Sequence, residues 1–188
     1  MSVRRLLIAL PVLVALAGCE SSPSQPRIAA APPRPAPPPN PLTLQAMADA
    51  HVKFGAKTYK PGGFDLVEPA ATPKEGATRV VVSLSKQLAF IYRGPSLVGV
   101  TTISAGVPDH PTDPGHFTVL NKAVKHRSNK YSNAPMPYMQ RLDHWGRAIH
   151  AGVVPGYPAS HGCIRMPLAV AKRLYGLTKV GDSVDIEA

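Results

Sequence analysis

Proline dominates one segment of this chain and limits where a fold can be built. Nine of the 19 residues from Pro23 to Pro41 are proline. Because proline lacks a backbone N–H and fixes φ, this segment cannot form a helix or a central strand. We expect a disordered, polyproline-like tether over residues 19–41, extending about 3.1 Å per residue. The fold of the 188-residue chain is therefore expected after this segment.

The first 19 residues have the organisation of an export signal. Arg4 and Arg5 form a positive start, and the 12 apolar residues from Leu6 to Ala17 are too few to span a membrane. The segment ends Leu-Ala-Gly-Cys at Cys19 and resembles a bacterial lipobox, in which the cysteine is acylated and becomes the mature N-terminus. The resemblance implies a signal peptide over residues 1–18. The alternative is an ordinary cleaved signal in which Cys19 is incidental.

Export sets the compartment and the state of the second thiol. We expect a periplasmic protein anchored in a lipid membrane through Cys19. The outer membrane is favoured, because Glu20 is not the aspartate that commonly signals inner-membrane retention. Cys163 is then the one free thiol in an oxidising compartment, which indicates reactivity or intermolecular pairing. The formal net charge of +10 indicates an anionic partner, and export argues against nucleic acid.

The rest of the chain divides into an appendage at residues 42–78 and a main domain at 79–188. In the appendage, Thr43 is a candidate N-cap for a short helix that runs to about Phe54. The apolar face expected for this helix consists of Leu44, Met47 and Val52. The main domain is long enough for one compact core.

The main domain alternates short apolar, β-branched runs with turn residues, which predicts strands. Residues 79–84 and 88–92 are separated by Ser-Lys-Gln and predict a hairpin. Further strands are expected over 97–106, 117–120, 146–150 and 183–186. One helix is expected to start near Pro167 and to stop at Gly176. Because no βαβ alternation appears, the predicted fold class is mostly β with one or two short helices.

The residues best suited to catalysis lie between positions 150 and 165. Residues 160–163 read Ser-His-Gly-Cys, and a cysteine nucleophile needs a base, for which histidine is suited near neutral pH. Gly162 permits a tight turn in which backbone N–H groups face a developing oxyanion. The helix expected at Pro167 would favour the thiolate through its N-terminus.

Three interpretations of Cys163 are open on residue chemistry alone. It is a nucleophile activated by His150 or His161, an inert buried thiol, or a metal ligand together with those two histidines. Their spacing matches no zinc motif, and we expect no metal. A thiol redox protein is a weaker alternative, because the chain lacks a CxxC partner.

A family resemblance favours the nucleophile. Ser-His-Gly-Cys-Ile-Arg-Met at 160–166, with Ile-His-Ala-Gly at 149–152, resembles the active-site signature of the L,D-transpeptidase catalytic-domain family. The resemblance covers residues 79–188. Weaker matching elements are Ser-Ala-Gly at 104–106, Thr-Asp-Pro-Gly at 112–115 and Ala-Pro-Met-Pro-Tyr-Met at 134–139. It implies a β-sandwich-like fold and an enzyme that remodels bacterial peptidoglycan.

The resemblance also assigns roles. It makes Cys163 the nucleophile and His150 the histidine that activates it. It makes His161 and Gly162 the rest of the motif, with the amides of Gly162 and Cys163 as oxyanion donors. Residues expected to bind substrate or shape its loop are Arg165, Tyr138, Met139 and Ser160.

Two departures from the family pattern follow the catalytic histidine. The interval from His150 to Ser160 is short, which implies a trimmed flap. Ala151 stands where some members carry serine or threonine, which implies that a backbone carbonyl orients His150 instead.

The reaction implied by the resemblance has two steps and needs no cofactor. Cys163 attacks the carbonyl between meso-diaminopimelate and D-Ala of a peptidoglycan tetrapeptide stem, and D-Ala leaves. A second diaminopimelate, or a lysine of a lipoprotein, then takes the acyl group from the thioester. Carbapenem-type inhibitors are expected to acylate the same thiol. The alternatives are an L,D-carboxypeptidase or endopeptidase using the same cysteine, and a non-catalytic wall-binding lipoprotein.

Overall fold

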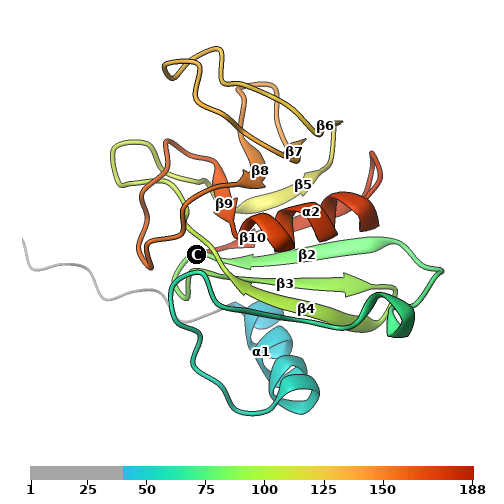
Figure 1. Ribbon diagram of the computed structural model, residues 1–188. Coiled ribbons are helices and arrows are strands. Elements are labelled where there is room, and N and C mark those ends of the chain that lie inside the picture. The colour runs from blue at the N-terminus through green and yellow to red at the C-terminus, as the bar shows by residue number, and fades with distance from the viewer. Residues whose placement is uncertain (1–39) are drawn as a thin grey trace, which may run out of the picture. The chain divides into compact units, whose positions relative to one another are not determined.

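The computed structural model describes residues 40–188. The expected signal peptide, Cys19 and the tether up to residue 39 lie outside the described residues. The described part contains two α-helices, one turn of 3₁₀ helix and ten strands in two sheets (Figure 1). Neither of these two helices is long and apolar enough to cross a membrane.

The two sheets differ in size and strand direction. The strands of the larger sheet are β1 (Phe64–Leu66), β2 (Thr78–Ser83), β3 (Leu88–Arg93), β4 (Ser96–Thr102), β5 (Gly115–Thr118) and β10 (Ser183–Glu187). They lie in the order β1-β4-β3-β2-β10-β5, and only β2 and β10 are parallel. The smaller sheet has the order β6 (Asn121–Ala123), β7 (Met139–Arg141), β8 (Ala148–Ala151) and β9 (Ile164–Met166), with β8 and β9 parallel. The helices are α1 (Pro41–Phe54), α2 (Leu168–Leu177) and the 3₁₀ turn η1 (Pro69–Ala71).

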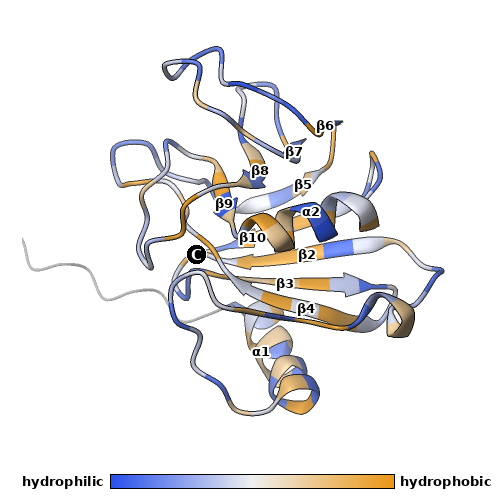
Figure 2. Cartoon of the chain, in the orientation of Figure 1, coloured by the Kyte–Doolittle hydropathy of each residue, from blue (hydrophilic) through white to orange (hydrophobic). Residues whose placement is uncertain are grey.

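The central strands of the larger sheet are buried on both faces. In β2, Val80 and Val82 pack in the core between the sheets, whereas Val81 packs on the opposite face. β3 repeats this alternation with Ile91 and Phe90. A strand buried on both faces is largely apolar rather than alternating, and orange segments lie along β2 and β3 in Figure 2. The expected hairpin of β2 and β3 and the mostly β, sandwich-like architecture are confirmed.

Helix α1 covers the face of the larger sheet that lies away from the smaller one (Figure 1). The expectation that Thr43 caps this helix is wrong, because α1 starts at Pro41 and Thr43 lies in its first turn. The backbone N–H and Oγ1 of Thr43 both donate to Oε2 of Glu187, at 2.7 and 2.6 Å. Thr43 therefore ties the helix to the last strand.

The expected apolar face of α1 is also wrong. Leu44 is 55% exposed and Val52 is 86% exposed, whereas Ala46 and Ala50 pack against the sheet. Small side chains let the helix backbone approach the strands closely, and the larger apolar side chains remain outside.

The appendage shares a sheet with the main domain. β1 pairs antiparallel with β4, so residues 42–78 supply both an edge strand and the covering helix. The start of β2 at Thr78 agrees with the expected start of the main strands.

Helix α2 packs between the two sheets, but its end differs from the expectation. Gly176 does not stop the helix, which ends at Leu177. Thr178 Oγ1 donates to the carbonyl of Leu174 at 2.9 Å, and Lys122 Nζ donates to the carbonyl of Tyr175 at 2.7 Å. These side chains satisfy the last carbonyls of the helix, which water or a glycine cap satisfies elsewhere.

Candidate active site

The outer face of the smaller sheet is the floor of the candidate site. Successive side chains of a strand point to opposite faces, so alternate positions share a face. Ile149 pairs with Ile164, and both pack in the core. The next residues along each strand, His150 and Arg165, also pair and therefore lie on the outer face. Cys163 directly precedes Ile164 and shares that outer face.

A cleft of about 930 Å³ opens over this floor. Of the residues that the sequence predicted for the site, those lining the cleft are Cys163, His150, His161, Gly162, Ser160, Arg165 and Met139. The long segment 126–137 forms one wall. The fold thus brings Met139, which lies 24 residues before Cys163 in the chain, into the same cleft as the thiol.

His150 is buried and held in one orientation. Its Nδ1 lies 2.8 Å from the carbonyl oxygen of Ala151. A carbonyl only accepts hydrogen bonds, so Nδ1 carries the proton and Nε2 is left as the basic nitrogen. The expectation that a backbone carbonyl orients His150 is therefore confirmed, and the carbonyl is that of Ala151. Burial lowers the pKa of His150 below its ordinary 6.5, with a smaller lowering from Arg165, so the ring is neutral at pH 7.

Cys163 is a half-buried free thiol at the edge of a small apolar cluster. It packs with Met136, Met139 and Ala148, and its Sγ donates to the carbonyl of Gly146 at 3.7 Å. Burial raises the pKa of Cys163 above its ordinary 9.0, opposed by the backbone of Ala148. The resting pair at neutral pH is therefore a neutral thiol and a neutral imidazole.

The turn before the thiol is held by Ser160. Its Oγ donates to the carbonyl of Cys163 at 2.5 Å and accepts the N–H of Gly162 at 3.2 Å. The amide of Gly162, expected as an oxyanion donor, is thus engaged within the turn. The amide of Cys163 donates to no acceptor among residues 40–188. Gly162 has φ +101°, a conformation that side chains with a Cβ rarely adopt, which explains glycine there.

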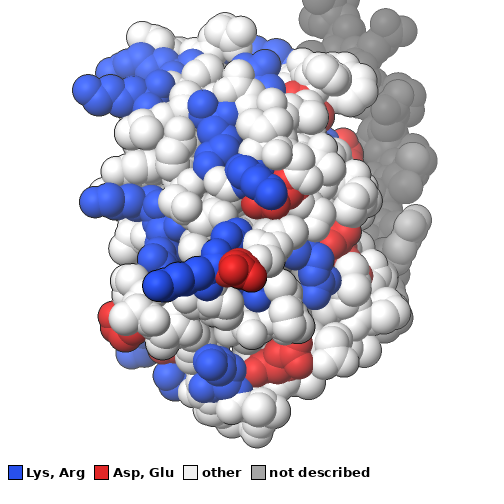
Figure 3. Space-filling model, turned by 90° about the vertical axis from the view of Figure 1, so that its right-hand side faces the viewer, with Lys and Arg blue, Asp and Glu red and all other residues white. Residues whose placement is uncertain are grey.

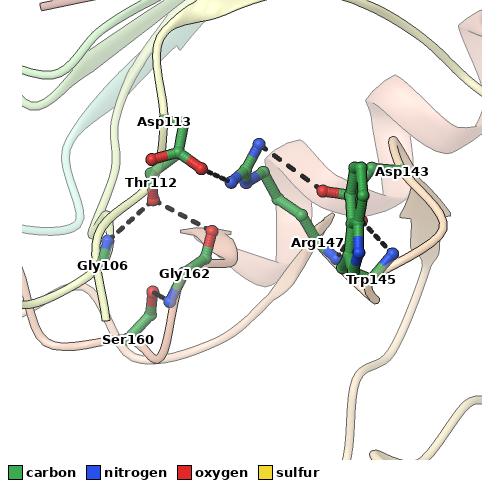
Figure 4. A network of polar contacts seen from close by, with 8 residues as sticks. All are labelled: Gly106, Thr112, Asp113, Asp143, Trp145, Arg147, Ser160 and Gly162. Atoms are coloured by element: carbon green, nitrogen blue, oxygen red, sulfur yellow. Dashed lines mark hydrogen bonds and ion pairs between the residues drawn. The ribbon is translucent and has the colours of Figure 1, made fainter. Parts of the chain in front are cut away.

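Thr112 anchors this turn from a second loop, as Figure 4 shows. Its buried Oγ1 donates to the carbonyl of Gly162 at 3.0 Å and accepts the N–H of Gly106 at 2.9 Å. The sequence placed Thr112 in a turn motif but gave no sign of this role. The bond joins positions 50 residues apart, and no local pattern reports such a contact.

A second polar network in Figure 4 shapes the rim of the cleft. Oδ1 of the buried Asp143 accepts the backbone N–H groups of Trp145 and Arg147, both at 2.9 Å. The Arg147 guanidinium pairs with Asp143 at 3.5 Å and also with Asp113. Asp143 is therefore a turn residue and does not orient a histidine. The Trp145 side chain is left 78% exposed at the rim.

The second histidine of the motif has different surroundings from His150. His161 is exposed, and its ring stacks on Tyr131 with centroids 4.5 Å apart. The ring of His110 lies 5.0 Å from that of His161. The three rings join three separate loops at the mouth of the cleft. Burial and a fixed tautomer distinguish His150 from His161.

Arg165 is a cation inside the cleft without a paired acid. Its guanidinium forms no ion pair or hydrogen bond with any of residues 40–188. A Cβ at Gly152 would lie 3.0 Å from the Arg165 side chain, so the glycine leaves space for the arginine stem. An unpaired guanidinium is suited to a substrate carboxylate.

One predicted substrate contact is wrong. Tyr138 does not line the cleft but packs against the core, with its ring edge-on to Tyr175 at 5.8 Å. Tyr138 has φ +54° and directly precedes β7, which begins at Met139. Met139 does line the cleft beneath the thiol.

The helix expected to start near Pro167 is confirmed, but a short strand separates it from Cys163. Strand β9 occupies Ile164–Met166, and α2 begins only at Leu168. A helix N-terminus stabilises negative charge mainly within its first turn. Cys163 lies outside that turn of α2, so the helix gives its thiolate little stabilisation. Within residues 40–188, no three His, Cys, Asp or Glu side chains are arranged to hold a metal ion.

A family model and several solved structures match this chain. The family model of the YkuD L,D-transpeptidase catalytic domain matches residues 77–186. An L,D-transpeptidase from Mycobacterium tuberculosis H37Rv has a similar fold, with TM-score 0.57 and 23% identity over 60% of this chain and 58% of that one. An L,D-transpeptidase from Stackebrandtia nassauensis gives TM-score 0.55 and 22% identity over 76% of this chain and 66% of that one.

A third structure with this fold carries an inhibitor. L,D-transpeptidase 3 from Mycobacterium tuberculosis, in complex with a faropenem-derived adduct, gives TM-score 0.53 and 23% identity over 58% of this chain and 60% of that one. No curated protein sequence matches the chain. The aligned region spans less than two thirds of the Mycobacterium tuberculosis H37Rv protein. Because the family model covers more than half of its 188 residues, the chain belongs to the YkuD family of L,D-transpeptidase catalytic domains.

Proposed function

We propose that this protein is a peptidoglycan L,D-transpeptidase whose nucleophile is Cys163. The observation that carries the proposal is the bond from Nδ1–H of His150 to the carbonyl of Ala151. It leaves Nε2 basic on the same sheet face as the thiol, in a cleft large enough for a peptide. Family membership supports the same reaction class.

The first step forms a thioester. His150 Nε2 takes the proton from Sγ of Cys163 as the sulfur attacks the carbonyl of the donor diaminopimelate. The free amide of Cys163 stabilises the oxyanion. The C–N bond to D-Ala then breaks, and His150 returns the proton to the departing amine.

The second step releases the enzyme. An amine of a second stem peptide attacks the thioester and loses a proton to His150, and the thiol is restored. A lysine of a lipoprotein is an alternative acceptor. If water enters instead, the same site is an L,D-carboxypeptidase or endopeptidase, because the outcome depends on which nucleophile reaches the thioester.

We place this reaction in the periplasm, with the enzyme anchored in a membrane. Acylated Cys19 would hold the enzyme on a periplasmic membrane surface, and the proline-rich tether would let the catalytic domain reach the wall. Basic side chains are spread over the face in Figure 3 and suit an acidic polymer. Membrane fractionation tests the anchor: wild type is expected in the outer-membrane fraction, and Cys19→Ala in the soluble periplasm.

Activity on muropeptides tests the reaction. Full-length protein in detergent is incubated with defined monomers and dimers, and the products are separated by mass. New cross-links with D-Ala release support transpeptidation, whereas shortened stems alone support the hydrolase. Cys163→Ala is expected to yield neither product. Unchanged muropeptides with wild type, and a role in cells unaffected by Cys163→Ala, would point to a non-catalytic wall-binding protein.

A further inference from the structure

Arg141 is a second unpaired cation on the floor of the cleft. It lies in β7 and lines the cleft, and it is half-buried. Its guanidinium has no ion pair and no hydrogen bond to any residue in the described range 40–188. A half-buried guanidinium without an acid keeps its planar set of N–H donors available to a ligand.

The strand register places Arg141 relative to the nucleophile. Arg141 pairs with Ala148 across β7 and β8. Extending the β8–β9 register by one residue sets Ala148 beside Cys163. Neighbouring strands lie about 4.8 Å apart, so the Cα atoms of Arg141 and Cys163 are roughly 10 Å apart on one face. Ala148 lies between them and is buried in the apolar cluster with Met136, Met139 and Cys163.

Arg141 and Arg165 occupy different sides of the reaction centre. Arg165 pairs with His150, so it lies beside the base that protonates the leaving amine. Arg141 lies two strands from Arg165, beyond Cys163 and Ala148. A donor peptide with its leaving group at His150 therefore extends its acyl part toward Arg141.

The cleft contains no free acid that would serve as the partner of Arg141. The one acidic residue among its lining side chains in the described chain is Asp143. Its carboxylate is occupied by Arg147 and by the backbone N–H groups of Trp145 and Arg147. A ligand carboxylate is the group that fits the planar, bidentate guanidinium.

We propose that Arg141 binds a carboxylate on the acyl part of the donor stem and selects donors in which that carboxylate is free rather than amidated. The inference rests on the proposed function, because it takes the donor to be a stem peptide acylating Cys163. In diaminopimelate this group is the side-chain carboxylate. An amide is neutral and keeps only one acceptor oxygen in place of the two of a carboxylate, so it cannot accept both N–H groups of the guanidinium fork.

A pair of synthetic tetrapeptide donors tests the proposal, one with the side-chain carboxylate of diaminopimelate free and one with it amidated. The rate of acyl-enzyme formation is followed by intact mass. Wild type is expected to favour the free donor by roughly tenfold or more, and Arg141→Gln to bring that ratio close to one. Arg141→Lys keeps a point charge but not the fork and is expected to give an intermediate ratio.

Arg79→Gln is the matched control, since it removes the same charge outside the cleft, where Arg79 lies over the ring of Tyr92. Its donor ratio is expected to equal that of wild type. An equal loss on both donors in Arg141→Gln would make Arg141 a structural brace and overturn the proposal. A wild-type ratio near one overturns it without any variant. If neither donor acylates wild type, the proposed function fails first and this inference fails with it.

Discussion

His150 donates its Nδ1–H to the carbonyl of Ala151 at 2.8 Å, and this one bond decides which ring nitrogen is available to the cleft. A main-chain carbonyl orients this histidine, which we propose as the base, and no side-chain carboxylate or hydroxyl is needed for that. The same residue lies on the strand whose register places it on the face of Cys163. The orientation of the proposed base and the placement of the proposed nucleophile thus come from adjacent strands of one small sheet.

The first prediction separates the base from the loop residues. His150→Ala is expected to slow acylation of Cys163 by a factor of about 10² to 10⁴, because general-base assistance is lost. Ser160→Ala removes two hydrogen bonds of the turn and is expected to slow it less. Adduct formation with a carbapenem, followed by intact mass, measures both. A larger effect of Ser160→Ala would refute the assignment of His150.

The second prediction concerns pH. Burial lowers the pKa of His150 and raises the pKa of Cys163, so both groups are neutral near pH 7. Only neutral His150 accepts the thiol proton, and protonating it abolishes activity. The acylation rate is therefore expected to fall with acid through a midpoint below 6.5 and to be flat from pH 7 to 8. A thiolate–imidazolium pair would instead lose activity on the alkaline side of neutrality as the imidazolium deprotonates.

The third prediction concerns the anchor of the nucleophile turn. Thr112→Val keeps the shape of the side chain but removes the bonds to Gly162 and Gly106. The half-buried N–H of Gly106 loses its acceptor and the buried carbonyl of Gly162 loses its donor, which together cost about 1 to 3 kcal/mol of stability. Acylation is expected to slow as the turn loosens, and Thr112→Ser to restore it. Urea unfolding and acylation rates on the same samples check both effects, and a rate unchanged in Thr112→Val would contradict the role.

The residues from which the sequence predicts the site are encoded locally. Cys163, His161 and Gly162 are contiguous, and Ala151 follows His150 directly. The contribution of Thr112 and the position of Arg141 depend on contacts between distant strands, which no local pattern records. The family resemblance predicted Tyr138 at the cleft, but its ring packs edge-on to Tyr175, another contact between residues distant in the chain.

The secondary structure was likewise predictable only where the signal is local. Long, apolar strands such as β2 and β3 were predictable, whereas β6, β7 and β9 have three residues each and carry no clear periodicity. Tertiary contacts changed two of the four predicted helix ends, whereas the end of α1 at Phe54 and the start of α2 next to Pro167 agree with the prediction. Thr43 has a cap residue's chemistry but uses it on Glu187, and Gly176 stays helical because Lys122 and Thr178 bind the last carbonyls.

The fourth prediction tests the attachment of α1. Thr43→Val removes the hydroxyl that donates to the buried carboxylate of Glu187 and leaves only the backbone N–H bond. A hydrogen bond to a charged group contributes about 1.5 to 3 kcal/mol, so the free energy of unfolding is expected to fall by that amount. Chemical denaturation measures it, with the exposed Thr58→Val as control. A loss equal to that of the control would show that Thr43 does not tie the helix to β10.

The most direct test is the mass of the enzyme after reaction. Full-length protein is mixed with a defined tetrapeptide donor, or with a carbapenem, and peptide mapping locates any adduct. A single acyl adduct on Cys163, with one equivalent of D-Ala released from the tetrapeptide and no adduct in Cys163→Ala, is the predicted result. Folded protein that keeps its unmodified mass with both reagents, or that carries the adduct elsewhere, would contradict the central claim.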